Sequence, residues 1–157
     1  MPDFVHLHLH SDYSLLRGMA TVDALVKKVA ASGMGAAALT DQGNLFGLLE
    51  YSLACKDLKW EVNPILGCEA YLAPRGHRER TDESPLGHHP FPLVILAEND
   101  VGYHNLIRLV STSYQHGFHL KPRIDFDLLE KSREGLIVLS GNLQSELPLL
   151  LLKGDRE

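Results

Sequence analysis

Short apolar runs alternate with helical segments along the chain, and this alternation limits the possible folds more than any other feature. Most of these runs are continuous rather than alternating with polar residues, which is typical of strands buried on both faces. Buried strands that alternate with helices indicate a parallel sheet with helices on its outer face. The sequence therefore predicts an α/β fold. The expected strands cover residues 4–8, 36–40, 64–72, 92–97 and 135–140.

Helix signals separate the first three of these strands. Thr21 is a suitable N-cap for a helix over residues 22–32, and Gly33 supplies its stop. A second helix is expected over residues 47–59. Its predicted buried side consists of Leu48, Leu49, Leu53 and Leu58.

Three further helices are expected in the second half of the chain. Asp100 is predicted to cap the first of them, a short helix follows over residues 126–131, and the last covers residues 143–152 with Pro148 near its start or at a kink. The apolar stripe of the helix after Asp100 is predicted to be Tyr103, Leu106, Ile107, Val110 and Tyr114.

Three histidines occupy alternate positions near the start of the chain, at His6, His8 and His10. Alternate residues of a strand share one face, so these imidazoles are expected to point the same way while the residues between them enter a core. Neutral imidazole is a common nitrogen ligand for zinc, iron and manganese, so the pattern indicates a metal site. The intervening residues are Val5, Leu7 and Leu9.

Polar residues gather where the predicted strands end. In α/β folds, binding and catalytic sites are built at the carboxyl ends of strands. We therefore expect one site there rather than scattered polar positions. Its candidate residues are His8, His10, Asp41, Gln42, Glu69, Ser140 and Asn142.

Composition narrows the class of protein. The 157 residues suit one domain or a piece of a larger protein, and 45% hydrophobic with 22% charged residues is typical of a folded soluble chain. Neither a membrane span nor a signal peptide is predicted. Two cysteines indicate no disulfide framework, so a cytoplasmic location is expected. With a net charge of −5, contact with nucleic acid would need a local site, bound cations or other domains.

Six segments, in order, resemble the N-terminal PHP (polymerase and histidinol phosphatase) domain of the alpha subunit of bacterial DNA polymerase III. Together they extend over nearly the whole chain. GYHNLIRLVS and the following KPRID point to the polymerase branch of the superfamily rather than to its free-standing phosphatases. The segments are HLHLHSDYSLL, ALTDQGNLFG, PILGCEAYLAP, LVILAENDVGYHNLIRLVS, KPRID and GLIVLSGNLQSE.

This resemblance implies a distorted (β/α)7-type barrel, of which residues 1–157 would form the first part. The rest of the barrel and the polymerase domains would lie outside this chain. The parent would be a DNA-directed DNA polymerase that uses magnesium and contacts DNA. Its other domains and replisome subunits, including a proofreading exonuclease, would be partners. The polymerase's own catalytic aspartates are not expected in this chain, which alone should not polymerise.

The resemblance also implies a set of metal ligands. His8 and His10 match the first ligand motif, Glu69 matches a carboxylate that can bridge two cations, and Asp41 matches either a ligand or a brace for its loop. His6, Gln42 and Asn142 are expected to support the ligands rather than bind the metal. The metal would be zinc, manganese or iron.

Four positions depart from the family's metal motifs. Gln42 stands where a histidine is usual, Asn142 where many members have cysteine, Pro92 where a histidine is common, and Arg17 where many have aspartate. Amide, proline and guanidinium groups are poor substitutes for transition-metal ligands. The family's last motif, Asp-x-His, is not in this chain. We therefore expect a degenerate site with at most one cation.

Three readings of the function follow. The first is a structural and interaction platform within the polymerase, which the lost ligands favour. The second is an active metal-dependent 3′–5′ exonuclease or phosphoesterase, which His8, His10 and Glu69 favour. The third is the equivalent domain of an error-prone paralogue, for which SLLRG and the proline before LVILA are typical.

Two regions receive structural interpretations. Residues 73–89 are expected to form a polar loop, in which His77 is solvated and Arg75, Arg78 and Arg80 face water. His104 is expected to face water or to pack locally on its helix.

Overall fold

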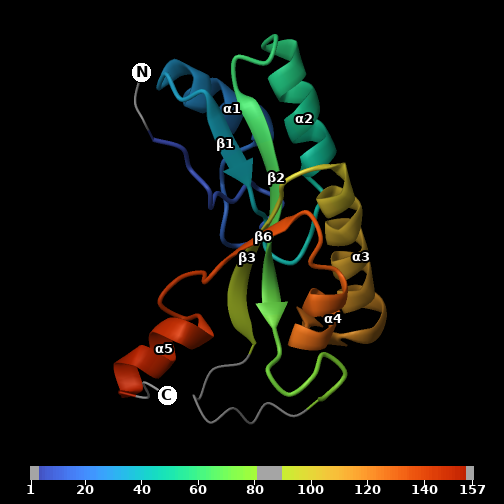
Figure 1. The fold of residues 1–157 in the computed structure, drawn as a ribbon. Helices are drawn as coiled ribbons and strands as arrows, with labels where there is room; N and C mark the ends of the chain where they lie inside the picture. Colours follow the sequence, from blue (N-terminus) through green and yellow to red (C-terminus); the bar gives the residue numbers. More distant parts are fainter. Residues whose placement is uncertain (1–3, 81–89, 155–157) are drawn as a thin grey trace.

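The computed structural model describes residues 4–80 and 90–154 (Figure 1). The α/β class is confirmed, because five helices and six strands are present in this part of the chain. The helices are α1 (Val22–Ala31), α2 (Leu48–Asp57), α3 (Asp100–His116), α4 (Phe126–Lys131) and α5 (Glu146–Lys153). The strands are β1 (Ala36–Leu39), β2 (Asn63–Leu72), β3 (Phe91–Ala97), β4 (Phe118–His119), β5 (Lys121–Ile124) and β6 (Leu136–Leu139).

Strand β2 organises the sheet, and Figure 1 shows it as the long strand through the centre of the molecule. Its first half pairs in parallel with β1, with Leu39 opposite Leu66, and its second half pairs antiparallel with β3, with Cys68 opposite Ile95. The end of β2 also pairs in parallel with β5, while β6 lies on the far side of β3. One strand thus carries residues from the core of the sheet to its polar end.

The prediction of a parallel sheet is wrong, because β2 with β3 and β3 with β6 are antiparallel pairs. Two consecutive strands that pair in parallel need a crossover connection, usually a helix, whereas two that pair antiparallel can be joined by a loop. The described part of the connection from β2 to β3, residues 73–80, contains no helix. Residues 81–89 of the predicted loop lie outside the described part. A continuous apolar run shows that a strand is buried on both faces. It does not show whether the strand runs parallel or antiparallel to its neighbours.

The predicted strand over residues 4–8 is also wrong. Only an isolated bridge between His6 and Ala37 forms there, although the backbone follows β1 as far as Leu9. The Leu9 N–H donates to the Thr40 hydroxyl at 3.0 Å rather than to a strand carbonyl, so a side chain interrupts the ladder. Val5 and Leu7 are 37% and 41% exposed, and the predicted entry of these residues into a core is therefore contradicted.

The helix boundaries follow the sequence closely. Thr21 caps α1 by accepting a hydrogen bond from the Ala24 N–H, and Gly33 follows the helix with a positive φ of 71°. The predicted cap of α3 is wrong by one residue. Asn99, rather than Asp100, accepts a hydrogen bond from the Gly102 N–H at 3.0 Å.

Two predicted helix faces are rotated from the observed ones. In α2, Leu48 is buried and Leu58, its C-cap, is partly buried, as predicted. Leu49 and Leu53, however, are 71% and 50% exposed, and Tyr51 and Cys55 are buried in their place. Tyr51 tolerates burial because its hydroxyl donates to the Ala37 carbonyl at 2.7 Å. In α3, Ile107 and Tyr114 of the predicted stripe are partly exposed, and the buried residues are Gly102, Asn105, Leu106, Leu109 and Ser113.

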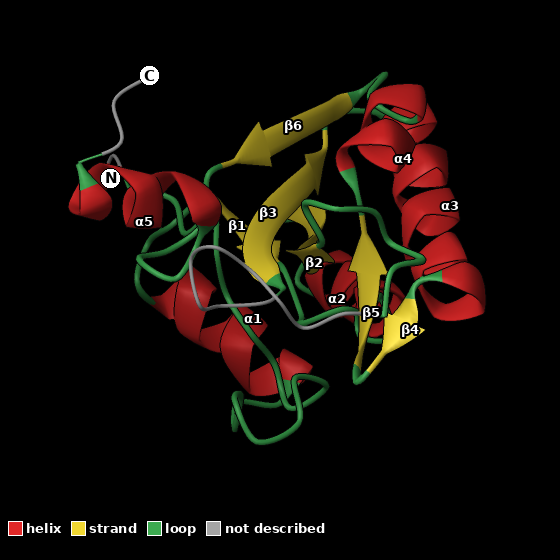
Figure 2. Cartoon of the chain, turned by 90° about the horizontal axis from the view of Figure 1, so that it is seen from below, coloured by secondary structure: helices red, strands yellow, loops and turns green. Residues whose placement is uncertain are grey.

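Three apolar clusters of the described residues stabilise the fold. The first lies between α1, β1 and α2, the second packs β2 and β3 against α3, and a small third one joins Ala38 of β1 to Val94 and Leu96 of β3. Leu45 contacts the first two clusters and joins them. Figure 2 shows the strands curving past one another with α3 and α4 along one side. No described helix is long and apolar enough to cross a lipid bilayer.

Candidate metal centre

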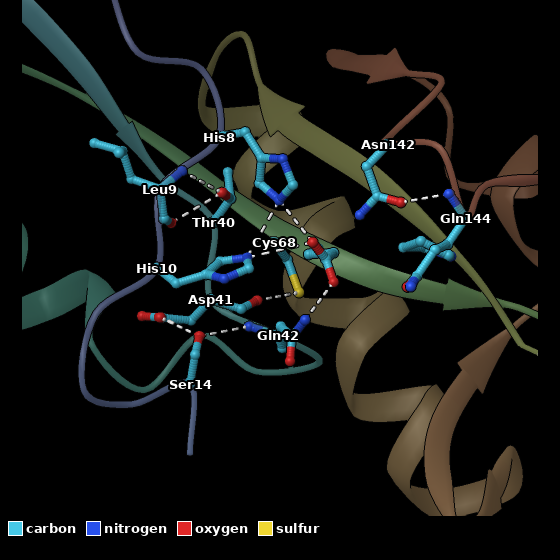
Figure 3. Close-up of polar contacts among 12 residues, drawn as sticks. His8, Leu9, His10, Ser14, Thr40, Asp41, Gln42, Cys68, Asn142 and Gln144 are labelled. Carbon is cyan, nitrogen blue, oxygen red and sulfur yellow. Dashed lines mark hydrogen bonds and ion pairs between the residues drawn. The ribbon is translucent and has the colours of Figure 1, made fainter. Parts of the chain in front are cut away.

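Glu69 provides the buried carboxylate of the site. It lies in the second half of β2 and is 2% exposed. The His8 Nε2 atom is 2.6 Å from Glu69 Oε2, and the His10 Nε2 atom is 3.3 Å from the same oxygen. The two imidazole Nε2 atoms are 3.2 Å apart, and Figure 3 shows their rings converging. Two predicted imidazole ligands and one predicted carboxylate therefore lie together.

The backbone brings these side chains together from three distant segments. The chain through His8 and His10 is held beside β1, since Ala38 N donates to His6 O at 2.7 Å and Thr40 N to Leu9 O at 2.8 Å. Beyond β1, a parallel bridge places Gln42 beside Glu69. The site thus lies where β1 ends and β2 continues, as expected for polar residues that follow strands.

Gln42 is hydrogen-bonded to the second oxygen of the Glu69 carboxylate. Its Nε2 donates to Glu69 Oε1 at 2.7 Å. Burial alone raises the pKa of Glu69, but hydrogen bonds from His10, His8 and Gln42 outweigh burial and lower the pKa to about 2. The carboxylate is therefore charged at neutral pH, as a metal ligand must be.

The three candidate ligand atoms, from His8, His10 and Glu69, are spaced to bind one cation. Ligands of a tetrahedral zinc ion at 2.0–2.1 Å from the metal are about 3.3 Å apart. The His8–His10 and His10–Glu69 separations of 3.2 and 3.3 Å match this spacing. The shorter 2.6 Å contact between His8 and Glu69 would lengthen by about 0.7 Å to admit the ion. Among the described residues, these are the ones whose ligand atoms lie within 4.8 Å of one another.

Asp41 has the contacts of a brace. Its carboxylate is 2% exposed and accepts hydrogen bonds from the Ser11 N–H and hydroxyl, both at 2.7 Å, and from the Ser14 hydroxyl at 2.5 Å. Ser14 Oγ in turn accepts from the Gln42 N–H at 3.0 Å. These bonds tie the loop after the histidines to the end of β1. Metal binding by Asp41 stays a prediction, as do the ligand roles of the other residues.

A pocket of about 370 Å³ opens over the three donors. Its polar lining includes Asn142 and Gln144 from the segment after β6, and the Gln144 N–H donates to Asn142 Oδ1 at 2.8 Å (Figure 3). Two cationic side chains, Arg17 and Lys121, also line it. The pocket is therefore suited to an anionic group beside a cation.

His6 lies apart from this group of donors. Its backbone bridges to Ala37, and its ring packs edge-on against Phe4 at 4.7 Å between centroids. It does not belong to the three residues whose ligand atoms converge. Its predicted supporting role remains untested.

His77 contradicts its predicted solvation. Its side chain is 14% exposed, and Nδ1 lies 2.5 Å from Asp125 Oδ2, which also accepts from the His77 N–H at 2.9 Å. The charged sequence around His77 resembles an open loop, but Asp125 is 48 residues away and cannot be recognised locally. His104 packs locally as expected, with Nδ1 2.7 Å from the Asp100 carbonyl.

Several site residues gave no usable signal in the sequence. Ser11 and Ser14 are separated from Asp41 by 30 and 27 residues, so SDYS alone indicates only a turn. Tyr71 lies within the strand predicted over residues 64–72 but was not identified as a site residue. Lys121 lines the pocket because β5 pairs with the end of β2, and β5 was not among the predicted strands. Its KPRI sequence is short and begins with a charge and a proline.

Comparisons with known proteins agree on one family. A family model of the PHP domain matches residues 6–157. The DNA polymerase III subunit alpha of Treponema pallidum is 44% identical over 153 residues, which cover 98% of this chain and 13% of that protein. The subunit of the same name from Thermus aquaticus is 42% identical over 152 residues, covering 96% and 12%. The chain thus spans only about an eighth of these relatives.

A solved structure shows a similar fold. An amidohydrolase from Chromobacterium violaceum aligns with a TM-score of 0.50 and 22% identity, over 71% of this chain and 33% of that chain. At this level of identity, the likeness concerns the fold alone.

Proposed function

Because the chain belongs to the PHP domain family, we propose that it acts as a structural platform within a DNA polymerase III alpha subunit and holds one divalent cation. The cation would be zinc, manganese or iron, bound by His8, His10 and Glu69. The longer protein would be a cytoplasmic DNA-directed DNA polymerase that uses magnesium in domains outside this chain. Its other domains, replisome subunits such as a proofreading exonuclease, and DNA would be the partners.

The observation that carries this proposal is the engagement of both Glu69 oxygens. One oxygen faces His8 and His10, and the other accepts a hydrogen bond from the Gln42 amide. A carboxylate that bridges two cations through its two oxygens needs both of them free for metal. The Gln42 amide lies where a second cation would otherwise bind to Glu69, and amide nitrogen is not a ligand for it.

Asp41 supports the same conclusion. Both of its oxygens accept hydrogen bonds from Ser11 or Ser14. Releasing this buried carboxylate for a metal would leave its donors unsatisfied, at a cost of roughly 1–3 kcal/mol for each buried group. One three-donor site is therefore favoured over a cluster.

When bound, a single cation of this kind can polarise a phosphoryl oxygen or activate a water molecule. The residues of this chain would chiefly hold it in place: His8 and His10 from the edge of β1, and Glu69 from β2. A cation bound to His8, His10 and Glu69 would link the extended N-terminal segment to β2 and so stabilise the domain.

Two measurements test this proposal with the variant Glu69→Gln and the exposed control Glu61→Gln. Added zinc should raise the melting temperature of the wild type and of Glu61→Gln, but not that of Glu69→Gln. A free zinc concentration of about one hundred times Kd would add about 2.7 kcal/mol of stability. Zinc-independent melting of the wild type would contradict the cation site.

The second measurement addresses the active exonuclease reading. A 5′-labelled single-stranded DNA is incubated with each protein and with zinc or manganese. We expect no shortening from the 3′ end beyond that in buffer for any of them. Shortening by the wild type and Glu61→Gln that Glu69→Gln abolishes would replace the platform with a metal-dependent nuclease.

A further inference from the structure

The outer side of α1 and α2 carries a groove of about 590 Å³. Figure 1 shows the two helices at the same end of the molecule. All residues that line the groove belong to these helices or to the C-cap of α2, and none of them lines the pocket over the candidate metal ligands. Val26, Ala54 and Leu58 are buried or partly buried and form its base. The groove is therefore a separate feature of the surface.

Helix α2 is apolar on two sides. One side, with Leu48, Tyr51 and Cys55, packs into the core. The other side carries Leu49 and Leu53, which lie one turn apart, line the groove and are 71% and 50% exposed. A surface helix normally presents polar residues to water on the side away from the core. Within residues 4–80 and 90–154, no segment covers these two leucines, so this side of α2 is suited to contact with a further chain.

The shape of the groove favours a helix as its occupant. From Leu49 to Asp57, α2 rises about 12 Å, which is roughly two turns of a helix. Side chains three and four residues apart on an added helix can pack between those of two existing helices. Addition of a strand would need an exposed sheet edge, and no residue of a strand lines this groove.

The rim of the groove is acidic. Three acids, Asp23, Glu50 and Asp57, face one base, Lys27, so the lining has a net charge of −2. The Lys27 Nζ atom is 2.7 Å from Asp23 Oδ2, so these two charges offset each other. Glu50 accepts a hydrogen bond from the Tyr13 hydroxyl, which brings no positive charge. The negative charges of Glu50 and Asp57 are therefore available to a partner.

This charge argues against two other occupants. The chain has a net charge of −5, so a second copy would bring further negative charge to an acidic rim. The anionic headgroups of a membrane would be repelled in the same way. A segment that carries lysine or arginine beside its apolar residues would be attracted instead.

We propose that the groove between α1 and α2 binds a basic amphipathic helix of a partner protein. Its apolar side chains would pack against Leu49 and Leu53, and its lysine or arginine residues would lie near Glu50 and Asp57. An amphipathic helix that places its apolar face in a groove is a common mode of peptide recognition. The inference deepens the proposed function, because it gives the chemistry of one partner of the platform. It does not depend on the cation.

Fluorescence anisotropy with synthetic peptides tests this proposal on the full 157-residue chain. The basic probe is a helical peptide of about 14 residues, with leucines three and four residues apart on one face, lysines beside them and alanine elsewhere. One control peptide has glutamates in place of the lysines, and another has serines in place of the leucines. We expect the basic probe to bind at least about tenfold more tightly than either control, and its affinity to fall as salt is added.

Variants of the chain locate the binding. Leu53→Ser, or Leu49→Ser as a second variant, should weaken binding of the basic probe roughly tenfold, because the buried leucine contact is lost. Leu152→Ser removes an exposed leucine of α5, outside the groove, and should bind like the wild type. Asp57→Lys should also weaken binding. Glu134→Lys makes the same change in net charge at an exposed position outside the groove and should not.

The groove proposal is overturned if the basic and acidic peptides bind equally well. It is equally overturned if both leucine variants of α2 bind the basic probe like Leu152→Ser. A wild-type dimer in analytical ultracentrifugation that Leu53→Ser dissociates would identify a second copy as the occupant and overturn the basic helix.

Each titration is repeated with EDTA to separate this proposal from the cation site. None of the three candidate metal ligands lines the groove, so EDTA should leave peptide binding unchanged. Failure of zinc to stabilise the wild type would then count against the cation site alone. Loss of peptide binding in EDTA would overturn the groove as an independent site.

Discussion

At the scale of single residues, hydrogen bonds to carboxylates decide what the pocket can hold. Glu69 directs one oxygen to two imidazoles and the other to the Gln42 amide, and Asp41 directs both to serines. The two acids are equally buried, yet only Glu69 faces the pocket. Position within the hydrogen-bond network, rather than residue type, separates the candidate ligand from the brace.

Replacing Asp41 with asparagine should destabilise the fold without removing the metal donors. Asparagine keeps one oxygen that can accept from the Ser11 N–H and the Ser14 hydroxyl, but its NH2 group replaces the oxygen that accepts from the Ser11 hydroxyl, and the charge that strengthens all three bonds is lost. We therefore expect a loss of roughly 1–3 kcal/mol in the free energy of unfolding. Urea denaturation measures this loss, with the exposed Asp12→Asn as the control. An Asp41→Asn variant as stable as the control, but unable to bind zinc, would make Asp41 a ligand instead.

At the scale of elements, periodicity in the sequence located the helices better than their buried faces. Helix limits depend on local signals such as Thr21 and Gly33, and these were predicted correctly. The buried face depends on the neighbours of a helix. In α2, the hydrogen bond between the Tyr51 hydroxyl and the Ala37 carbonyl draws an amphipathic side chain inward, while Leu49 faces solvent. The periodicity of the sequence gives no information about a distant hydrogen-bond partner such as the Ala37 carbonyl.

Adjacent residues of α3 provide a test of this rotated face. Leu106 is fully buried against β2 and β3, whereas Ile107 is 38% exposed. Leu106→Ala should therefore lower the free energy of unfolding by about 2–5 kcal/mol. Ile107→Ala should cost less than about 1 kcal/mol. Equal losses in chemical denaturation would mean that the stripe predicted from the sequence is the buried one.

The N-terminus of α4 predicts a pH dependence. Burial alone raises the pKa of Asp125, but hydrogen bonds from the His77 N–H and ring and from the Leu128 N–H lower it below 3.8. The folded carboxylate therefore binds a proton less tightly than the unfolded one. Its stabilisation is complete above pH 3.8 and is lost as the pH falls through the lowered folded value.

Asp125→Asn removes this titration while leaving a residue that can cap the helix. The wild type should exceed the variant in unfolding free energy at neutral pH, and the difference should shrink as the pH falls below 3.8. Denaturation at a series of pH values measures it. Asp127→Asn, in the same turn but exposed, should show no such convergence. A difference between Asp125→Asn and the wild type that is constant with pH would exclude this contribution.

At the scale of the whole molecule, the sheet assembles the site from segments that the sequence keeps apart. His8, His10 and Glu69 were predicted from the histidine alternation, the strand ends and the family resemblance, and they do lie together. Lys121 was not, because its place depends on the pairing of β5 with β2. Strand direction was also mistaken, since local patterns carry no information on how distant strands pair.

The most direct test of the single-cation account is the metal content of the purified chain. The protein is loaded with zinc, desalted and measured by elemental analysis beside Glu69→Gln and Glu61→Gln. We predict one equivalent of zinc in the wild type and in Glu61→Gln, and none in Glu69→Gln. Two or three equivalents in the wild type, lost together in Glu69→Gln, would contradict the account and indicate a multinuclear site.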